Sequence, residues 1–108
     1  MIKPIIILTT VSDKENAKRI AKTIVEEHLA ACVSIIDNIN SVYEWKGNIC
    51  DDIEYLLVIK SMGSKGKDVF KRIQELHPYE VPELIRLDVV DIGEKYWLWM
   101  KDWLTGDK

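Results

Sequence analysis

The chain has 108 residues, of which 47% are hydrophobic and 31% are charged, and its formal net charge is −3. This length provides for one hydrophobic core, so we expect a single domain over residues 1–108. The lysines are spread along the chain, so the basic surface that nucleic acids require is missing and no nucleic-acid partner is expected. No segment approaches the roughly 20 apolar residues that cross a membrane, and no cleavable leader is evident, so we expect a cytoplasmic protein.

The first predicted elements are a strand and a helix. Residues 4–11 form a nearly continuous β-branched run, which is typical of a central strand. Ser12 and Glu15 have the spacing of a capping box, so a helix is expected to begin there. Apolar residues at three- and four-residue spacing over 17–25 predict that it packs on a sheet. His28 follows at the helix end, where the helix dipole favours a charged imidazole, and we interpret it as structural.

A long hairpin is predicted next. Residues 30–36 have strand composition, Asp37-Asn38 interrupts it, and residues 41–46 resume an extended structure with two aromatic side chains on one face. Gly47-Asn48 provides a turn. Residues 53–60 then form the return strand, so the two strands are expected to pair antiparallel.

A second helix, a fourth strand and a third helix complete the chain. The buried face of the second helix is predicted to consist of Val69, Phe70, Ile73 and Leu76. Pro78 ends this helix, because a residue before proline is disfavoured in helical geometry. Residues 84–90 alternate between apolar and polar, with Ile85, Leu87 and Val89 on one face. The segment from Asp91 to Glu94 repeats the cap spacing and opens the last helix.

The order strand, helix, strand, strand, helix, strand, helix predicts an α+β fold of the ferredoxin-like βαββαβ type with an extra C-terminal helix. Its antiparallel sheet has the strand order 4-1-3-2 and carries both inner helices on one face. The composition agrees with this order, because the two most apolar strands, the first and the third, lie at the centre.

Several chemistries of this fold are excluded. The segment after the first strand lacks the glycine-rich cradle and arginine of an acylphosphatase and the CxxC of a metal chaperone. The central strands carry only Tyr55 as a stacking aromatic, which argues against RNA recognition. Cys32 and Cys50 form neither a CxxC pair nor a zinc spacing, so we expect two free thiols. No catalytic Ser-His-Asp or Cys-His pair is evident, and we expect no enzyme.

Residues 77–83, HPYEVPE, hold two of the three prolines. One interpretation is a stiff joint, in which the prolines end a helix and extend the entry to the last strand. In the other, His77, Glu80 and Glu83 provide an imidazole and two carboxylates to a divalent cation. Residue spacing leaves both interpretations open.

Four segments together resemble the CutA family of divalent-cation tolerance proteins: LAACVSI (29–35), SVYEWKGNI (41–49), LLVIK (56–60) and HPYEVPEL (77–84). The resemblance runs essentially end to end. It implies a ferredoxin-like protomer in a tight homotrimer with an assembly like that of the nitrogen-regulatory P-II proteins. It also implies a link to copper and divalent-metal tolerance, and no established catalytic activity.

The resemblance also suggests site residues. His77 falls on a family histidine proposed as a copper ligand, whereas Thr9 and Leu76 stand where some members have cysteine and histidine. A cleft between subunits would be formed by Tyr43, Trp45, Lys60, Tyr79 and Glu83. The ligand would be copper, another divalent cation or a small anion, and none would be required for folding.

A non-enzymatic homotrimer that binds such a ligand at clefts between subunits is therefore the predicted function. The alternative is a regulatory trimer, P-II-like or amino-acid-sensing, that signals to a protein partner whose identity the sequence does not give. P-II proteins signal through a long loop between the second and third strands. The two-residue turn predicted here favours the first function.

The apolar residues of the last helix also favour association between copies of the chain. Tyr96, Trp99, Met100 and Trp103 form one apolar stripe, while Trp97, Leu98 and Leu104 place apolar groups on other sides. One small sheet cannot cover them all, and exposed aromatic surfaces are usually interfaces. The predicted interface residues are Tyr43, Trp45, Tyr96, Trp97, Trp99 and Trp103.

Overall fold

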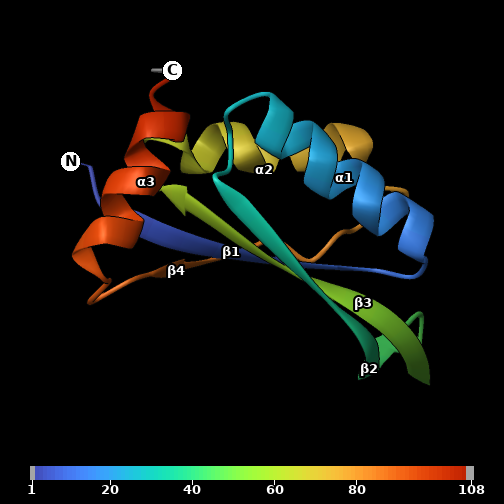
Figure 1. The fold of residues 1–108 in the computed structure, drawn as a ribbon. Coiled ribbons are helices and arrows are strands. Elements are labelled where there is room, and N and C mark those ends of the chain that lie inside the picture. Colours follow the sequence, from blue (N-terminus) through green and yellow to red (C-terminus); the bar gives the residue numbers. More distant parts are fainter. Residues whose placement is uncertain (1, 107–108) are drawn as a thin grey trace.

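The computed structural model describes residues 2–106. One four-stranded antiparallel sheet has the order β2-β3-β1-β4, which confirms the predicted order 4-1-3-2 and the ferredoxin-like fold (Figure 1). The strands are β1 (Pro4–Val11), β2 (Cys32–Trp45), β3 (Asn48–Met62) and β4 (Ile85–Asp88). The helices are α1 (Lys14–Glu26), a 3-10 turn η1 (Gly63–Lys65), α2 (Gly66–Leu76) and α3 (Glu94–Leu104).

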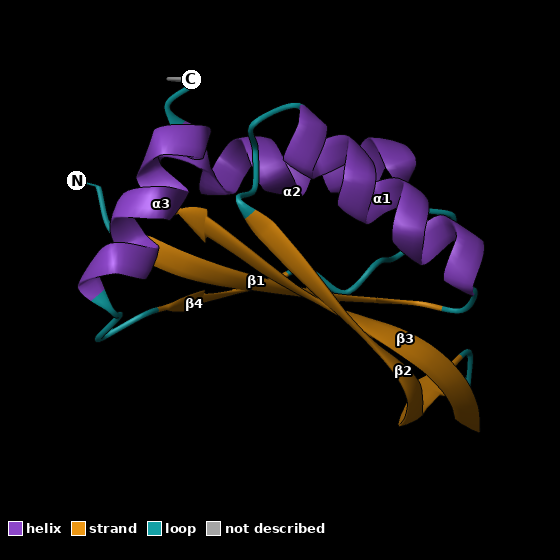
Figure 2. Cartoon of the chain, in the orientation of Figure 1, coloured by secondary structure: helices purple, strands orange, loops and turns teal. Residues whose placement is uncertain are grey.

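Helices α1 and α2 cover one face of the sheet, as expected (Figure 2). The core between them contains Ile5, Ile7, Ile20, Ile24, Leu57, Ile59, Val69 and Ile73, all of which are buried. Each such side chain contributes about 1.5–3 kcal/mol by leaving water. The predicted apolar stripes of both helices are confirmed, because Ala17, Ile20, Ala21 and Ile24 of α1 and Val69 and Ile73 of α2 are buried.

The other face of the sheet has no helix over it (Figure 2). Side chains of paired residues share a face, and Leu8 pairs with both Val58 and Ile85. We call this surface the open face; its apolar residues include Ile6, Leu8, Ile36, Leu56, Val58, Ile85 and Leu87, all partly or fully exposed. The strand predicted over residues 84–90 is shorter, Ile85–Asp88, so Val89 lies outside it. Within β4 the predicted alternation is confirmed, but its apolar side lies away from the helices.

The β2–β3 hairpin extends beyond the helices (Figure 1). The predicted interruption at Asp37-Asn38 is a bulge within one continuous strand, where Asn38 has a φ of 60°. The turn is Lys46-Gly47, one residue earlier than predicted. Both residues have positive φ, 50° and 85°, which is the type I′ geometry that matches the twist of a hairpin.

Two predicted helix starts are wrong in detail. Asp13, not Ser12, caps α1, because its Oδ2 accepts from the Asn16 amide at 2.9 Å. A carboxylate at this position also interacts favourably with the helix dipole. At the start of α3 the capping residue is Gly93, which has no side chain to accept a hydrogen bond. The predicted end of α2 is confirmed, since the helix stops at Leu76.

Helix α3 packs at one end of the sheet (Figure 1), and its buried side differs from the predicted stripe. Met100 and Leu104 are buried against Ala31 and Met62, with Trp97 and Trp103 packed beside them. Tyr96, Leu98 and Trp99 point outward. Two of the predicted interface residues, Trp97 and Trp103, are thus engaged within the chain.

His28 is tied to α3. Its ring stacks on Trp103 at 3.9 Å between centroids, and its Nδ1 lies 2.6 Å from the Trp103 carbonyl oxygen. The Trp103 indole donates to the Val25 carbonyl at 2.8 Å. These contacts confirm the structural interpretation of His28.

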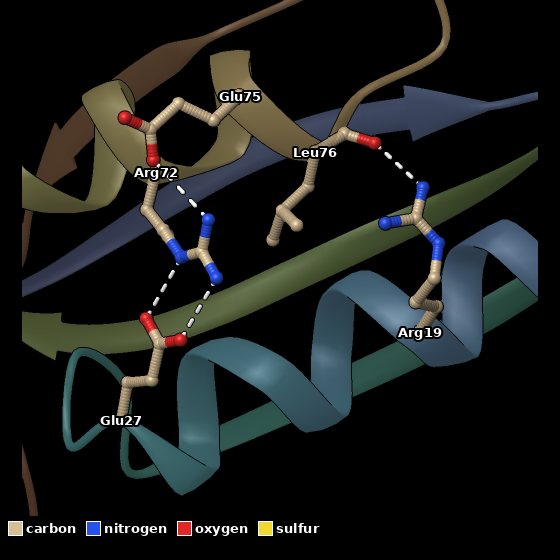
Figure 3. A network of polar contacts seen from close by, with 5 residues as sticks. All are labelled: Arg19, Glu27, Arg72, Glu75 and Leu76. Carbon is tan, nitrogen blue, oxygen red and sulfur yellow. Dashed lines mark hydrogen bonds and ion pairs between the residues drawn. The ribbon is translucent and has the colours of Figure 1, made fainter.

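Polar contacts on the outer surface join the two inner helices (Figure 3). Arg72 binds both carboxylate oxygens of Glu27, at 2.8 and 2.9 Å, and one oxygen of Glu75 at 3.2 Å. Arg19 donates to the last carbonyl of α2, that of Leu76, at 2.6 Å. These bonds fix the segment that leaves α2 and leads to the site described next.

Candidate ligand cavity

A cavity of about 710 Å³ lies between the β2–β3 hairpin and the segment that joins α2 to β4. We call it the hairpin cavity. It is lined by Thr10 of β1, Ser41, Val42, Tyr43, Glu44 and Trp45 of β2, Glu54 of β3, and Tyr79, Glu80, Val81 and Glu83 of the joining segment. Its lining includes four carboxylates and no lysine, arginine or histidine.

His77 holds one wall of the cavity in place. Its Nε2 donates to the Thr10 carbonyl at 2.8 Å, and its Nδ1 accepts from the Tyr79 amide at 3.1 Å. The pairing of β4 with β1 ends at Leu8, so no backbone amide of β4 reaches the Thr10 carbonyl. The His77 imidazole donates the hydrogen bond that a longer β4 would have provided. His77 is 8% exposed, and burial lowers its pKa. HPYEVPE therefore acts as a joint in this chain.

Glu54 lies at the inner end of the cavity. It is 6% exposed, and its Oε2 accepts from the Tyr79 hydroxyl at 2.5 Å. Within residues 2–106 it forms no ion pair. Burial, followed by the bond to Glu54, raises the pKa of Tyr79, and burial together with the charge of Glu54 raises the pKa of Glu83. The cavity therefore holds negative charge that the described chain does not neutralise.

The hairpin supplies the aromatic rim. The Tyr43 hydroxyl donates to Asp52, and this bond raises the pKa of Tyr43 to about 12. Trp45 is 41% exposed, and the ammonium of Lys46 lies 5.6 Å from the centre of its ring. The rim thus offers aromatic faces to a molecule in the cavity.

Most of the cleft residues suggested by the sequence lie together here. Tyr43, Trp45, Tyr79 and Glu83 all line the cavity. Lys60 is not among the lining residues: its ammonium donates to the Ser34 hydroxyl at 2.6 Å and lies 3.7 Å from the sulfur of Cys32. The strand register places it near the other end of the hairpin, opposite Cys32.

Sequence reasoning missed Thr10, Glu44 and Glu54 as site residues. A signal was present for Glu54, because it is a carboxylate that directly precedes the apolar run of residues 55–59. Nothing local marked Thr10, which joins the cavity only through the pairing of β1 with β3.

The predicted metal residues lie in two different environments. Glu80 and Glu83 line the cavity, whereas both ring nitrogens of His77 are bonded to the backbone. Among residues 2–106, no group of three or more His, Cys, Asp or Glu side chains is arranged to hold a metal ion. The carboxylates that line the cavity are nonetheless suitable donors for a cation, so the metal contact of His77 stays a prediction.

Comparisons with known proteins place the chain in one family. The family model of the CutA1 divalent ion tolerance protein matches residues 5–103. The divalent-cation tolerance protein CutA of Thermus thermophilus is 38% identical over 97 residues, which are 90% of this chain and 94% of that protein.

Solved structures agree. The divalent ion tolerance protein CutA1 of Ehrlichia chaffeensis superposes with a TM-score of 0.91 at 31% identity, covering 96% of this chain and 97% of that one. A periplasmic divalent cation tolerance protein CutA of Archaeoglobus fulgidus gives a TM-score of 0.90 at 28% identity, covering 94% and 98%. The chain therefore belongs to the CutA1 divalent ion tolerance protein family.

Proposed function

We propose that this chain forms a homotrimer that binds cations at the hairpin cavity and serves in divalent-cation tolerance without catalysing a reaction. The observation that supports this most directly is a cavity with four carboxylates and no basic side chain in its lining. A buried carboxylate without a counter-charge is unfavourable, so a bound cation would be stabilised at the buried Glu54 and, more weakly, at the partly exposed Glu83. The same charge disfavours the small anionic ligand considered from the sequence.

Among residues 2–106 the carboxylates of Glu54, Glu80 and Glu83 do not converge as a three-residue ligand group, so a divalent cation in the cavity would be held by one or two of them together with water. The His77 imidazole, whose nitrogen ligands suit copper and zinc, would join them only by giving up its bond to Thr10 or to Tyr79. Copper binding through His77 and ion binding through carboxylates are therefore separable hypotheses.

Titration calorimetry with Cu²⁺, Zn²⁺ and Mg²⁺ tests both hypotheses. We expect Glu83→Gln to weaken binding, while Glu26→Gln, at an exposed site on α1, should leave it unchanged. Weakened Cu²⁺ binding by His77→Gln would support an imidazole ligand, and unchanged Cu²⁺ binding would exclude it. Binding of all three ions that is insensitive to Glu83→Gln would contradict the cavity as the site.

Association is supported by surface that one chain leaves uncovered. The open face presents half-exposed Ile85 and Leu87, and the hairpin exposes Val42, Ile49 and Ile53. Soluble monomers seldom expose apolar patches this extended, and strands β2 and β4 end the sheet with unpaired edges. Copies of the same chain can cover both features, and the number three comes from the family resemblance.

Light scattering after size exclusion tests the assembly. We expect about three times the chain mass of 12.5 kDa. Leu87→Arg, on the open face, should lower that mass, whereas Asp88→Arg, on the opposite face of the same strand, should not. A folded wild-type monomer would contradict the proposal.

The proposal also includes a compartment and an alternative function. The proposed compartment is the cytoplasm. No helix among residues 2–106 is long and apolar enough to cross a membrane. A P-II-like signalling role is the alternative function. The Lys46-Gly47 turn is too short to form the exposed loop through which P-II proteins signal, so we favour ligand binding.

A further inference from the structure

The hairpin cavity is larger and more aromatic than a bare metal ion requires. Its volume is about 710 Å³, and Tyr43, Trp45, Tyr79, Val42 and Val81 supply rings and apolar groups between the carboxylates. Sites for small organic molecules combine such a lining with a few placed polar groups. We propose that the cavity binds an organic polycation with apolar segments between its charges, that is, a di- or polyamine. This inference rests on the proposed cation site and names a second class of ligand for it.

The inner end of the cavity offers acceptors for one ammonium group. Thr10 is 9% exposed and lines the cavity together with Glu54. Glu54 uses Oε2 for the Tyr79 hydroxyl, and its other oxygen is without a partner in the same residues. A primary ammonium carries three N–H donors, and a buried ammonium needs an acceptor for each of them. A buried carboxylate that receives a charged donor also gains a strong hydrogen bond.

The apolar and aromatic part of the lining suits the methylene chain of an amine. The cavity is lined by the apolar side chains of Val42 and Val81 and by the aromatic side chains of Tyr43 and Trp45. The ammonium of Lys46 lies over one face of the Trp45 ring, so a bound ammonium would displace Lys46 or use the other face of the ring. An amine with alternating methylene and ammonium groups would use both kinds of contact.

The charge of the lining calls for more than one positive group. Glu54 lies inside, and Glu80 and Glu83 lie on the joining segment at the other wall. One carboxylate oxygen of Glu44 already accepts a hydrogen bond from the Gly47 amide at 2.7 Å. A single ammonium bound at Glu54 would leave Glu83 without a counter-charge, whereas a second ammonium along the same molecule would neutralise it.

Titration calorimetry of the full chain with spermidine tests the inference, with butylamine as the singly charged probe and 1,4-butanediol as the uncharged one. We expect spermidine to bind more tightly than butylamine and the diol not to bind. Glu54→Gln retains an oxygen acceptor for Tyr79 but removes the charge, so it should weaken spermidine binding by about tenfold or more. Trp45→Leu should weaken it less, and Glu26→Gln should not change it.

The outcomes separate this inference from the proposed function. Divalent-ion binding without spermidine binding would overturn the inference and leave the cation site intact. Spermidine binding without divalent-ion binding would support the inference and contradict the metal role. Spermidine binding that Glu54→Gln and Glu26→Gln change equally would be nonspecific attraction to an acidic protein, which overturns the inference. Binding of neither cation by an intact trimer would overturn the inference and the proposed cation site together.

Discussion

Replacing His77 by alanine is expected to destabilise the protein by about 2–4 kcal/mol. The substitution removes two hydrogen bonds, to the Thr10 carbonyl at 2.8 Å and from the Tyr79 amide at 3.1 Å, each with a net contribution of roughly 0.5–1.5 kcal/mol. The Thr10 carbonyl is then left near the sheet without this donor, which adds about 1–3 kcal/mol where water cannot replace it. Because these contributions overlap, we expect a value below their full sum.

Urea unfolding measures this change, with wild type and variant compared at one protein concentration because association contributes to stability. His77→Gln is the matched control, since its amide can still donate to Thr10, and it should lose less stability than alanine. An unchanged midpoint for His77→Ala, combined with lost copper binding, would refute the joint and identify the imidazole as a ligand.

The pH dependence gives a second test of the same residue. Burial lowers the pKa of His77 below its ordinary 6.5, so the unfolded chain binds the proton more readily than the folded one. Stability contributed by His77 is therefore complete above pH 6.5 and is lost as pH falls through the window between 6.5 and the lowered value. His77→Gln should flatten the profile in that window, and an identical profile in both proteins would contradict the assignment.

Three further predictions concern other residues. Glu83→Gln should raise the melting temperature at pH 7 in the absence of ligand. The pKa of Glu83 is raised in the folded chain, so its charged form destabilises the fold and stability falls as pH rises above 4.5. A lower melting temperature of the variant would contradict this. Arg72→Ala removes an exposed ion pair with Glu27, and salt screens such pairs. The substitution should therefore lower the melting temperature by less in high salt than in low salt. An effect that is independent of salt would indicate a packing role for Arg72 instead. Thiol counting after denaturation should find Cys32 and Cys50 free, and a disulfide in freshly reduced and purified protein would refute this.

Periodicity was sufficient for the arrangement of the elements. The spacing of Ile20, Ile24 and Ile73 fixes which side of each helix meets the sheet, and Pro78 fixes where α2 ends. The caps were harder to predict, because Ser12 and Asp13 are adjacent and both can accept from the first turn. Only the backbone conformation decides between them, and it places Asp13 at the end of the extended segment, with φ −134° and ψ 153°.

The site was only partly predictable, because it is assembled across strands. Tyr43, Trp45 and Tyr79 were found through a recognisable motif, but Glu54 becomes a site residue only when β3 pairs with β2 beside the joining segment. Lys60 shows the converse. It lies in a segment that resembles the family, yet the register opposite Cys32 takes it away from the cavity.

The apolar side chains of β4 point to the face of the sheet that no helix covers. Residues 85–88 have two faces, and Arg86 and Asp88 lie on the side of the helices, where Arg86 passes over Gly66 at the start of α2. Ile85 and Leu87 are therefore placed on the side that no helix covers. A sequence that had been selected for a solitary chain would be expected to reverse this pattern, with the apolar residues under the helices. The direction of alternation in four residues is thus independent physical support for a second copy over the open face.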